Sequence, residues 1–432
     1  MADPALVWRP TNAPVASSRT DDIWFISADT GWLVNSNGNI LRTDDGGNSW
    51  ALQHHARRVY LRCVGFSNPQ LGWVGSVSAI QRLFTTRNGG AQWDVVGNLP
   101  PTPNKVCGLA VVDDQVIYGS GTNDPVDDPA ILKTTDGGAT WTSIDMTAHA
   151  SLLVDIHFAT RDRGWVVGGL ADAAVVPAGQ RPTRDMVRPV VLFTEDGGKT
   201  WTDLIPDKTG FPHGEWGWKL FFLNDSVVFV SLENFRAGAI LKSIDGGKSW
   251  RRLPINDQQH NDNLEGVGFA SDDIGWVGGW GNTSKTTNGG ENWADANQGQ
   301  VGVHLNRFRF FGNPATLGYA SGNTVYKYSA EPVTPVVVEA AAPSLLRRAQ
   351  PMAAGPAEHV IEIPPDAGSL SVDLWDRFGN HLEVMSQEKP AAGERKIRVD
   401  PQAAVTAGLL GGTGILRVTI GELTESTLMP LR

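Results

Sequence analysis

Three carboxylates are the side chains of this sequence best suited to catalysis. Asp155 and Glu265 each lie within a short hydrophobic segment, and Glu215 begins a third such segment. Glycosidic cleavage needs two carboxyl groups that face one bond across a cleft. Asp155 and Glu265 could therefore act as an acid and base pair, and Glu215 is a further catalytic candidate.

The same carboxylates also have a structural interpretation. Arg62, Lys219 and Arg307 occupy comparable positions in other hydrophobic segments. Because convergent opposite charges usually form ion pairs, these basic residues could hold Asp155 and Glu265 in place. We favour the ion-pair interpretation, and the sequence leaves open whether the protein is an enzyme.

A histidine-bound metal is another option. His213, His260 and His304 lie in three successive connections of a repeated pattern, and imidazole nitrogen is a common ligand of transition metals. The chain lacks a local signature such as His-Glu-x-x-His, so spacing alone defines no coordination geometry. The sequence thus names candidate metal ligands but identifies no cofactor.

A wider set of polar and aromatic residues could contact a ligand. They lie in the connections between repeats or at the beginning of the segments that follow. The predicted ligand-binding residues are His54, His55, Arg58, Arg62, His213, Trp216, Lys219, His260, Asp262, His304 and Arg307. Loops on a rigid scaffold often carry function, so this clustering favours one functional surface.

An eight-residue phrase, repeated six times, defines the elements that must position these residues. Four copies have the form Ser/Thr-x-Asp-Gly-Gly-x-Ser/Thr-Trp and span residues 43–50, 134–141, 194–201 and 243–250. In two weaker copies, at 86–93 and 286–293, Asn replaces Asp. The closing tryptophans are 43, 48, 60, 49 and 43 residues apart, a period that suits the four short strands of a propeller blade.

Short hydrophobic segments bounded by glycine, such as 61–66, predict strands rather than helices. After the sixth phrase, segments 306–311, 317–321 and 324–328 form one more set without a copy of it. Residues 6–10 look like the missing fourth strand of that set. We therefore predict an all-β fold, a seven-bladed β-propeller over residues 1–330 whose N-terminal strand closes the ring.

Strand order predicts two unlike faces for this ring. In a four-stranded blade, the turn between the third and fourth strands lies at one end, and the phrase occupies that turn. The loop between the second and third strands and the crossing to the next blade lie at the opposite end. Most histidines and the insertions at 123–129, 169–189 and 233–238 fall there. We expect that loop-rich face to carry the functional site.

The phrase itself is predicted to be structural. Its Asp oxygens can accept backbone NH groups within the turn, its glycines permit positive φ, and its Trp can pack between blades. Acidic side chains beside glycines could also bind Ca²⁺, but turn aspartates usually bond locally. The residues assigned the structural role are Asp45, Asp136, Asp196, Asp245, Trp50, Trp141, Trp201 and Trp250.

The phrase is the Asp-box, and residues 1 to about 330 resemble Asp-box (BNR) repeat propellers. Pairs such as Gly72-Trp73 that precede the box most resemble the photosystem II stability and assembly factor family. This resemblance implies a seven-bladed propeller that helps to assemble a membrane complex without doing chemistry. Sialidases share the box, but the chain lacks their Phe/Tyr-Arg-Ile-Pro motif, to which residues 252–254 are the nearest imitation.

The amino-acid composition changes near residue 330. Residues 331–356 are rich in Pro and Ala without periodicity, which predicts a semi-extended linker. Segments 358–363, 369–376, 381–385, 395–400 and 414–420 then alternate like strands, so we predict a small β-sandwich over 357–432. The run Leu374-Trp375-Asp376-x-x-Gly379 resembles the immunoglobulin-like domain of flagellar hook-capping and other exported bacterial proteins.

Composition narrows the possible partners. The 432 residues include 36 basic and 46 acidic side chains, a net charge of −10, which argues against nucleic acid or an anionic membrane as main partner. No stretch approaches the ~20 apolar residues of a membrane span. The start shows no targeting segment, so the compartment is unknown, with a slight preference for secretion or the periplasm after signal removal. Cys63 and Cys107 are expected to be reduced core thiols.

Two functions remain. The first is a binding propeller whose loop-rich face recognises a protein or polysaccharide partner, with the C-terminal sandwich as an anchor or second binding module. The second is a polysaccharide-active glycoside hydrolase or lyase, with a histidine-bound metal as an option. Carboxyl groups about 5 to 10 Å apart in a groove would favour the enzyme, whereas carboxylates buried against arginines would favour the binding protein.

Overall fold

We describe a computed structural model of the chain, and it confirms the predicted all-β class. The residues it describes are 6–256, 263–279, 283–296, 304–330, 346–347, 357–365, 367–376, 381–400, 412–420 and 423–431. The chain divides into two compact units, of which the first comprises Met1–Val15 and Arg19–Pro335. The second comprises Ala16–Ser18 and Val336–Arg432. Each unit is described separately below.

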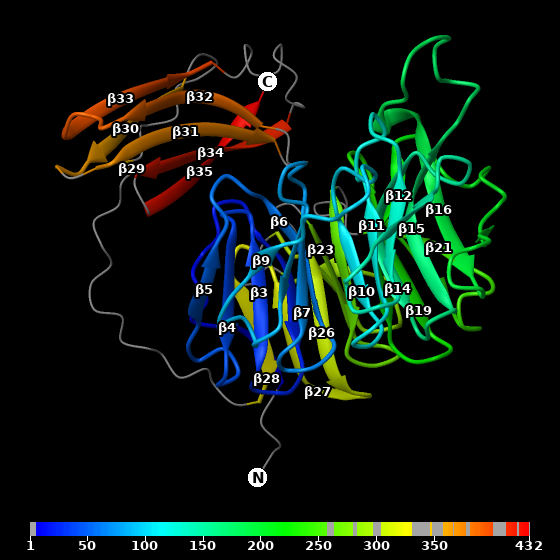
Figure 1. The fold of residues 1–432 in the computed structure, drawn as a ribbon. Coiled ribbons are helices and arrows are strands. Elements are labelled where there is room, and N and C mark those ends of the chain that lie inside the picture. The colour runs from blue at the N-terminus through cyan, green and yellow to red at the C-terminus, as the bar shows by residue number, and fades with distance from the viewer. Residues whose placement is uncertain are drawn as a thin grey trace. The chain divides into compact units, whose positions relative to one another are not determined.

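In its described residues, the first unit contains seven four-stranded antiparallel sheets (Figure 1). The first three are β2 (Thr20–Phe25), β3 (Gly31–Asn35), β4 (Asn39–Thr43) and β5 (Ala51–His55); β6 (Leu61–Phe66), β7 (Gly72–Ser76), β8 (Leu83–Thr86) and β9 (Asp94–Val95); and β10 (Gly108–Val111), β11 (Ile117–Gly121), β12 (Ala130–Thr134) and β13 (Thr142–Asp145). In each of these three sheets the strands lie in chain order, so each is an up-and-down meander.

The remaining four sheets follow the same plan. They are β14 (Leu152–Phe158), β15 (Gly164–Ala171), β16 (Val187–Thr194) and β17 (Thr202–Asp203); β18 (Glu215–Phe222), β19 (Val228–Asn234), β20 (Ala239–Ser243) and β21 (Arg251–Pro254); β22 (Leu264–Phe269), β23 (Gly275–Gly279), β24 (Thr283–Thr286) and β25 (Ala294–Asp295); and β26 (Arg307–Gly312), β27 (Ala315–Ser321), β28 (Val325–Ser329) and β1 (Val7–Pro10). A short 3-10 helix, η1 (Arg184–Met186), interrupts the loop between β15 and β16.

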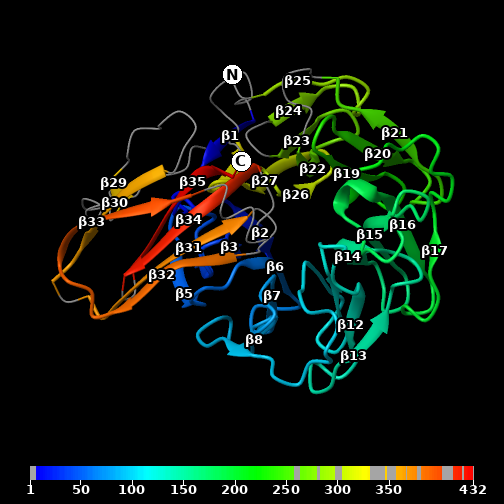
Figure 2. The same cartoon turned by 90° about the horizontal axis from the view of Figure 1, so that it is seen from above.

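The first strand of each sheet faces the middle of a closed ring. Each such strand contacts the first strand of the next sheet, from β2 and β6 through to β22 and β26, and β26 contacts β2 again. Figure 2 shows the sheets in chain order around the central axis. Since a ring of sheets brings all the first strands together, residues far apart in the sequence meet at its centre.

The N-terminal strand closes the last sheet, as the sequence predicts. β1 pairs antiparallel with β28, with Val7 opposite Ser329 and Pro10 opposite Tyr326. Trp8 is buried and lies edge-on to Trp276 in the preceding sheet, with ring centroids 5.5 Å apart. This pairing covers the backbone edge that β28 would otherwise expose.

A repeated aromatic contact explains the Gly-Trp pairs. Phe66, at the end of β6, stacks on Trp32 of the neighbouring sheet at a centroid distance of 3.7 Å and meets the box tryptophan Trp93 edge-on. The ring of Phe66 lies against Gly72, where an added Cβ would come within 2.4 Å of ring carbon. Equivalent stacks join three other pairs of sheets, so glycine is required where the phenylalanine covers the next strand.

The second unit has two described sheets. One contains β29 (Leu346–Arg347), β30 (Ala357–Ile363) and β33 (Gly393–Val399), and the other contains β32 (His381–Glu388), β31 (Ser369–Asp376), β34 (Gly412–Ile420) and β35 (Leu423–Leu431). Side chains from both sheets, among them Ile361 and Val372, form one hydrophobic core. The sequence analysis did not anticipate β29 or β35.

Candidate functional site

The Asp-box turns bond within themselves. In the third sheet, Asp136 Oδ1 accepts hydrogen bonds from the Thr140 backbone NH at 2.9 Å and from Thr134 Oγ1 at 2.7 Å, and Asp136 Oδ2 accepts one from Thr140 Oγ1 at 2.6 Å. These bonds lower the pKa of Asp136 to about 2. Gly137 and Gly138 both have positive φ, which the turn requires. The carboxylate oxygens are thus engaged in the turn.

The box tryptophans lie between neighbouring sheets. Trp201 donates to Gly198 O at 3.1 Å within its own box, and its ring meets Phe158 edge-on in a core that also contains Tyr118 of the preceding sheet. Trp250 and Trp293 make the same bond within their boxes. This end of the ring, which we call the box face, is therefore built for packing.

The opposite end, which we call the loop face, consists of the loops between second and third strands and the crossings between sheets. Near this end, strands β2 and β6 each contain a β-bulge at a charged residue. Asp21 in β2 and Arg62 in β6 are the extra residues, which pair with no residue of the neighbouring strand. Glu265 is the extra residue of an equivalent bulge in β22. A bulge adds one residue to a strand and turns a side chain away from regular alternation. The bulges thus add charges to the middle of the ring.

Eight buried charged residues meet there and form what we call the central charged cluster. Its members come from the first strands or the segment just before β2, and they are Arg19, Asp21, Asp22, Arg62, Asp155, Lys219, Glu265 and Arg307. Arg19 and Arg62 both donate to Asp21 Oδ1 at 2.9 Å, and Arg19 also pairs with Glu265. Both arginines lie over the ring of Trp218, Arg62 at 4.6 Å from its centroid.

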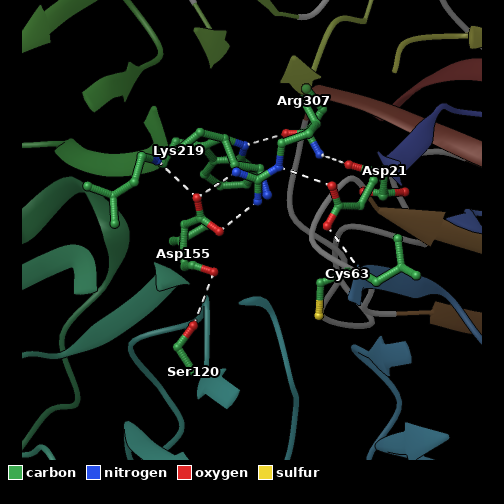
Figure 3. Close-up of polar contacts among 12 residues, drawn as sticks. Asp21, Cys63, Ser120, Asp155, Lys219 and Arg307 are labelled. Carbon is green, nitrogen blue, oxygen red and sulfur yellow. Dashed lines mark hydrogen bonds and ion pairs between the residues drawn. The ribbon is translucent and has the colours of Figure 1, made fainter. Parts of the chain in front are cut away.

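Arg307 connects two carboxylates on the other side of this cluster. Its Nη atoms donate to both oxygens of Asp155, at 2.7 and 2.9 Å, and its Nε donates to Asp22 Oδ1 at 3.0 Å (Figure 3). The Leu220 backbone NH also donates to Asp155 at 2.9 Å. Burial alone would raise the pKa of Asp155, but Arg307 and Lys219 outweigh burial and hold that pKa well below its ordinary value.

These contacts bear on the three catalytic candidates. Asp155 and Glu265 are buried and bonded to different arginines, and Glu215 accepts two hydrogen bonds from Arg252, at 3.0 and 2.6 Å. Burial nevertheless raises the pKa of Glu215. Carboxylates whose oxygens face guanidinium groups are poorly placed to exchange protons with a substrate. Arg307 is one of the partners that the ion-pair interpretation offers for Asp155, whereas Glu265 pairs with Arg19, which that interpretation did not include.

The two metal candidates within the described residues have different surroundings. His213 bonds Asp172 at 2.9 Å at the edge of the loop face, whereas His304 is buried, and burial lowers its pKa to about 4. His260 lies outside the described residues. Within the described part of the chain, no group of three or more His, Cys, Asp or Glu side chains is placed to hold a metal ion.

Several predicted ligand-binding residues are not exposed. Trp216 is buried against Phe235, so its ring offers no free surface. Arg62, Lys219 and Arg307 belong to the central charged cluster and are buried as well. Their burial follows from their places in the first strands, which line the middle of the ring.

The remaining predicted residues have mixed positions. His54 and His55 lie in strand β5 rather than in the crossing that follows it, and His55 contacts Asn39 at 2.7 Å. Arg58 lies in that crossing with a positive φ of 60°. Asp262 lies outside the described residues.

The loop face is braced by contacts between its loops. In the loop between β15 and β16, Arg184 donates to Asn123 O at 2.7 Å, and Arg181 donates to Val126 O at 2.6 Å and pairs with Asp128 at 3.2 Å. Both acceptors belong to the loop between β11 and β12. Lys105, in the crossing before β10, pairs with Asp127 of that same loop at 3.3 Å. Three connections are thereby fixed to one another.

Exposed apolar side chains gather on this braced face. Of the eight large apolar residues exposed in the described part of the chain, five lie in its loops and crossings, namely Val15, Ile80, Val126, Val175 and Phe235. Ile80 is 90% exposed. Ile244 is the member of the eight that lies in a box turn, and Leu52 and Val95 lie in outer strands. The sequence analysis weighed polar residues there and missed these apolar ones.

The ring of meander sheets, its box turns and its central cluster define a BNR-type β-propeller. The family model described as "Photosynthesis system II assembly factor YCF48" matches residues 2–148. The Photosystem II assembly lipoprotein Ycf48 of Synechococcus sp. (strain CC9902) is 25% identical over 272 residues, which cover 55% of this chain and 76% of that protein. The chain is a BNR-type propeller related to the photosystem II assembly factor.

Solved structures show the same fold. YCF48 bound to D1 peptide has a TM-score of 0.54 at 19% identity and covers 76% of this chain and 99% of its own. YCF48 from Cyanidioschyzon merolae has a TM-score of 0.54 at 18% identity, with 75% and 99% covered. An ancestral GH74 enzyme has a TM-score of 0.54 at 13% identity, with 99% of this chain and 63% of the enzyme covered.

No helix in the described residues is long and apolar enough to cross a membrane.

Proposed function

We propose that the protein is a binding propeller whose loop face recognises a segment of a partner protein. The observation that carries the proposal is the concentration of exposed large apolar residues on that face. Exposed apolar groups rimmed by polar residues are typical of protein interaction sites. The YCF48 structure solved with a D1 peptide is a propeller of this type with a peptide partner.

Bracing of the loops supports the same proposal. A surface that is ordered before binding loses less conformational entropy when a partner arrives. Arg184, Arg181 and Lys105 each tie one connection to the loop between β11 and β12, which carries the exposed Val126. Ile80 and Val126 are therefore presented by neighbouring sheets of a rigid ring.

The glycoside hydrolase alternative has no comparable support. Its two main candidates, Asp155 and Glu265, are buried in ion pairs, and likeness to the GH74 enzyme at 13% identity extends to the fold alone. Trp216, the aromatic residue that the sequence analysis offered as a ligand surface, is buried, which removes that argument for a polysaccharide partner.

We further propose an extracytoplasmic location. The Synechococcus relative is named a photosystem II assembly lipoprotein, and the word lipoprotein supports this proposal. For this chain, cell fractionation checks the proposal, because recovery with the cytoplasmic fraction alone would contradict it.

Site-specific photo-crosslinking tests the proposed face. A photoreactive phenylalanine analogue would replace Ile80, Val126 or Phe235 on the loop face, and Ile244 on the box face as the matched exposed control. In the native cells, we expect the loop-face positions to crosslink to one common protein, identified by mass spectrometry, and the box-face position to give no such adduct. A common adduct at Ile244, with none on the loop face, would contradict the proposal.

A further inference from the structure

The central charged cluster contains an ammonium group that makes no hydrogen bond. Lys219, on β18, is 1% exposed, and its Nζ has no hydrogen-bond partner. The same holds for Nε and Nη2 of Arg62, although Arg62 Nη1 bonds Asp21. Burial of unpaired cationic nitrogen is costly, and such atoms are normally satisfied by a protein group or by a small bound species.

Each carboxylate of the cluster accepts a hydrogen bond from an arginine, and Asp21 Oδ2 is the carboxylate oxygen of the cluster for which the described residues offer no donor. Asp21 and Glu265 bond to Arg19, and Asp22 and Asp155 bond to Arg307. The nearby Arg309, whose Nη2 lies 3.9 Å from Asp22, adds one more positive charge. The eight members of the cluster are four cations and four carboxylates, and Arg309, whose side chain is 32% exposed, adds a fifth cation beside them.

The neighbouring thiols do not supply the missing negative charge. Cys63 and Cys107 lie within electrostatic reach of Lys219, and Cys107 also lies within reach of Arg62. Both are buried, and burial raises the pKa of each thiol above its ordinary value. They therefore stay protonated at neutral pH and contribute small, weakly polar walls to the site.

We propose that a small monovalent anion, of which chloride is the abundant example, binds in the middle of the ring beside Lys219 Nζ and Arg62 Nη2. Its charge offsets the positive charge that Arg309 adds, and it accepts the hydrogen bonds of Lys219 Nζ and Arg62 Nη2, for which no protein group serves as acceptor. The electrostatic setting agrees with this assignment. Burial first, and then Arg307, lower the pKa of Lys219 to about 8, while Asp155 and Asp22 act in the opposite sense. An anion beside the ammonium would favour its charged form.

Crystals of the full-length protein soaked in sodium bromide give the direct test. We expect an anomalous bromide peak in contact with Lys219 Nζ. Absence of a peak there, or a water refined at that position under bromide, would overturn the proposal.

Thermal melting in sodium chloride and in sodium gluconate, at equal ionic strength and pH 7, tests whether the site is occupied in solution. A ligand that binds only the folded state raises the melting temperature, so chloride should raise it by several degrees. Lys219→Met should remove this rise, and Lys133→Met should keep it, because the Lys133 ammonium is bonded to Gly197 O at 2.8 Å. If Lys219→Met keeps the chloride effect, the anion binds elsewhere.

The two measurements together leave no outcome open. A bromide peak without any chloride effect on melting would mean an adventitious ion only, and would overturn the proposal. If Lys219→Met does not fold, the bromide peak and the chloride effect on the wild-type protein decide it. Partner binding at the loop face can fail or succeed independently of either result.

Discussion

The third residue of a box is either Asp or Asn, and the residue four positions later differs between these two kinds of box. In the four boxes with Asp, a Ser or Thr hydroxyl donates to the second carboxylate oxygen at 2.6 Å. In the two boxes with Asn, that later residue is Gln92 or Asn292, whose backbone NH donates to the Asn oxygen. An amide has an NH2 group in place of the second carboxylate oxygen, so a hydroxyl at that position would have no second oxygen to which it could donate.

The boxes with Asp should make the stability of the folded protein depend on pH in the acid range. The pKa values of Asp136, Asp196 and Asp245 are lowered to about 2, mainly by hydrogen bonds from Thr140, Thr200 and Ser249. A carboxyl with a lowered folded-state pKa stabilises the protein above its unfolded pKa of ~3.9, and that contribution is lost as pH falls through about 2. We expect the melting temperature to fall between pH 4 and pH 2, and to fall less in the Asp136→Asn, Asp196→Asn, Asp245→Asn variant. Parallel curves for both proteins would contradict this assignment.

Removal of Asp155 should destabilise the protein rather than merely alter a surface. In Asp155→Ala, Arg307 keeps Asp22 but loses both bonds to Asp155 inside the ring. Breaking one side of a buried ion pair costs about 3 to 5 kcal/mol. Urea denaturation should show such a loss, and the Asp155→Leu, Arg307→Met double variant should be less destabilised than Asp155→Ala. A single variant of unchanged stability would restore interest in Asp155 as a catalytic group.

Single-residue roles were only partly predictable from the sequence. The box aspartates and tryptophans could be assigned because a short turn largely determines its own hydrogen bonds. The burial of Trp216 could not be predicted from the sequence, because it depends on contact with Phe235, which lies in the loop between β19 and β20. The charged bulges at Asp21 and Arg62 depend on register with the second strand, which no local pattern encodes.

The strand that closes the ring offers a test of one element. Trp8 of β1 packs against Trp276, Phe308 and Tyr328. Deletion of residues 1–10 removes this ring and exposes the edge of β28, so the melting temperature should fall by at least about 6 °C, given roughly 3 kcal/mol or more for a lost buried Trp. A synthetic peptide of residues 1–12, added in excess, should restore part of the loss. Unchanged melting after the deletion would refute closure by β1.

Element prediction succeeded where the repeat imposes its own period. Strand β6 spans the predicted residues 61–66, and β1 takes the place expected from the missing fourth strand of the last set. Beyond the repeat, five segments were predicted in the second unit, but β35 (Leu423–Leu431) was not among them. Its sequence combines charged, hydroxyl and proline residues, and its pairing with β34 comes from tertiary register.

The division of the chain into two modules remains a proposal. Each unit has its own hydrophobic clusters, one of which is confined to residues 361–420. Because each core is complete within its unit, we expect a fragment ending at Pro335 to fold alone and melt cooperatively in calorimetry. Broad, non-cooperative melting of that fragment would place the boundary elsewhere or make the second unit necessary for folding.

Function at the level of the whole molecule follows from the contrast between its two faces. Box turns repeat one bonded structure and expose Ile244, whereas the connections at the other end are braced and expose several apolar side chains. Strand order predicts that the box turns and the connections between sheets lie at opposite ends of the ring. It could not predict that the exposed contacts would be apolar, because loop side chains far from any motif carry no periodic signal.

The most direct test of partner binding at the loop face is the affinity of the crosslinked partner for purified protein, measured by isothermal titration calorimetry. We expect Ile80→Ser, Val126→Ser and Val175→Ser, combined, to weaken binding at least about tenfold, because apolar anchors dominate such interfaces. Ile244→Ser should bind like the wild-type protein, and all variants should retain its melting temperature within a few degrees. Full affinity in the triple variant, or loss of affinity in Ile244→Ser, would contradict the proposed face.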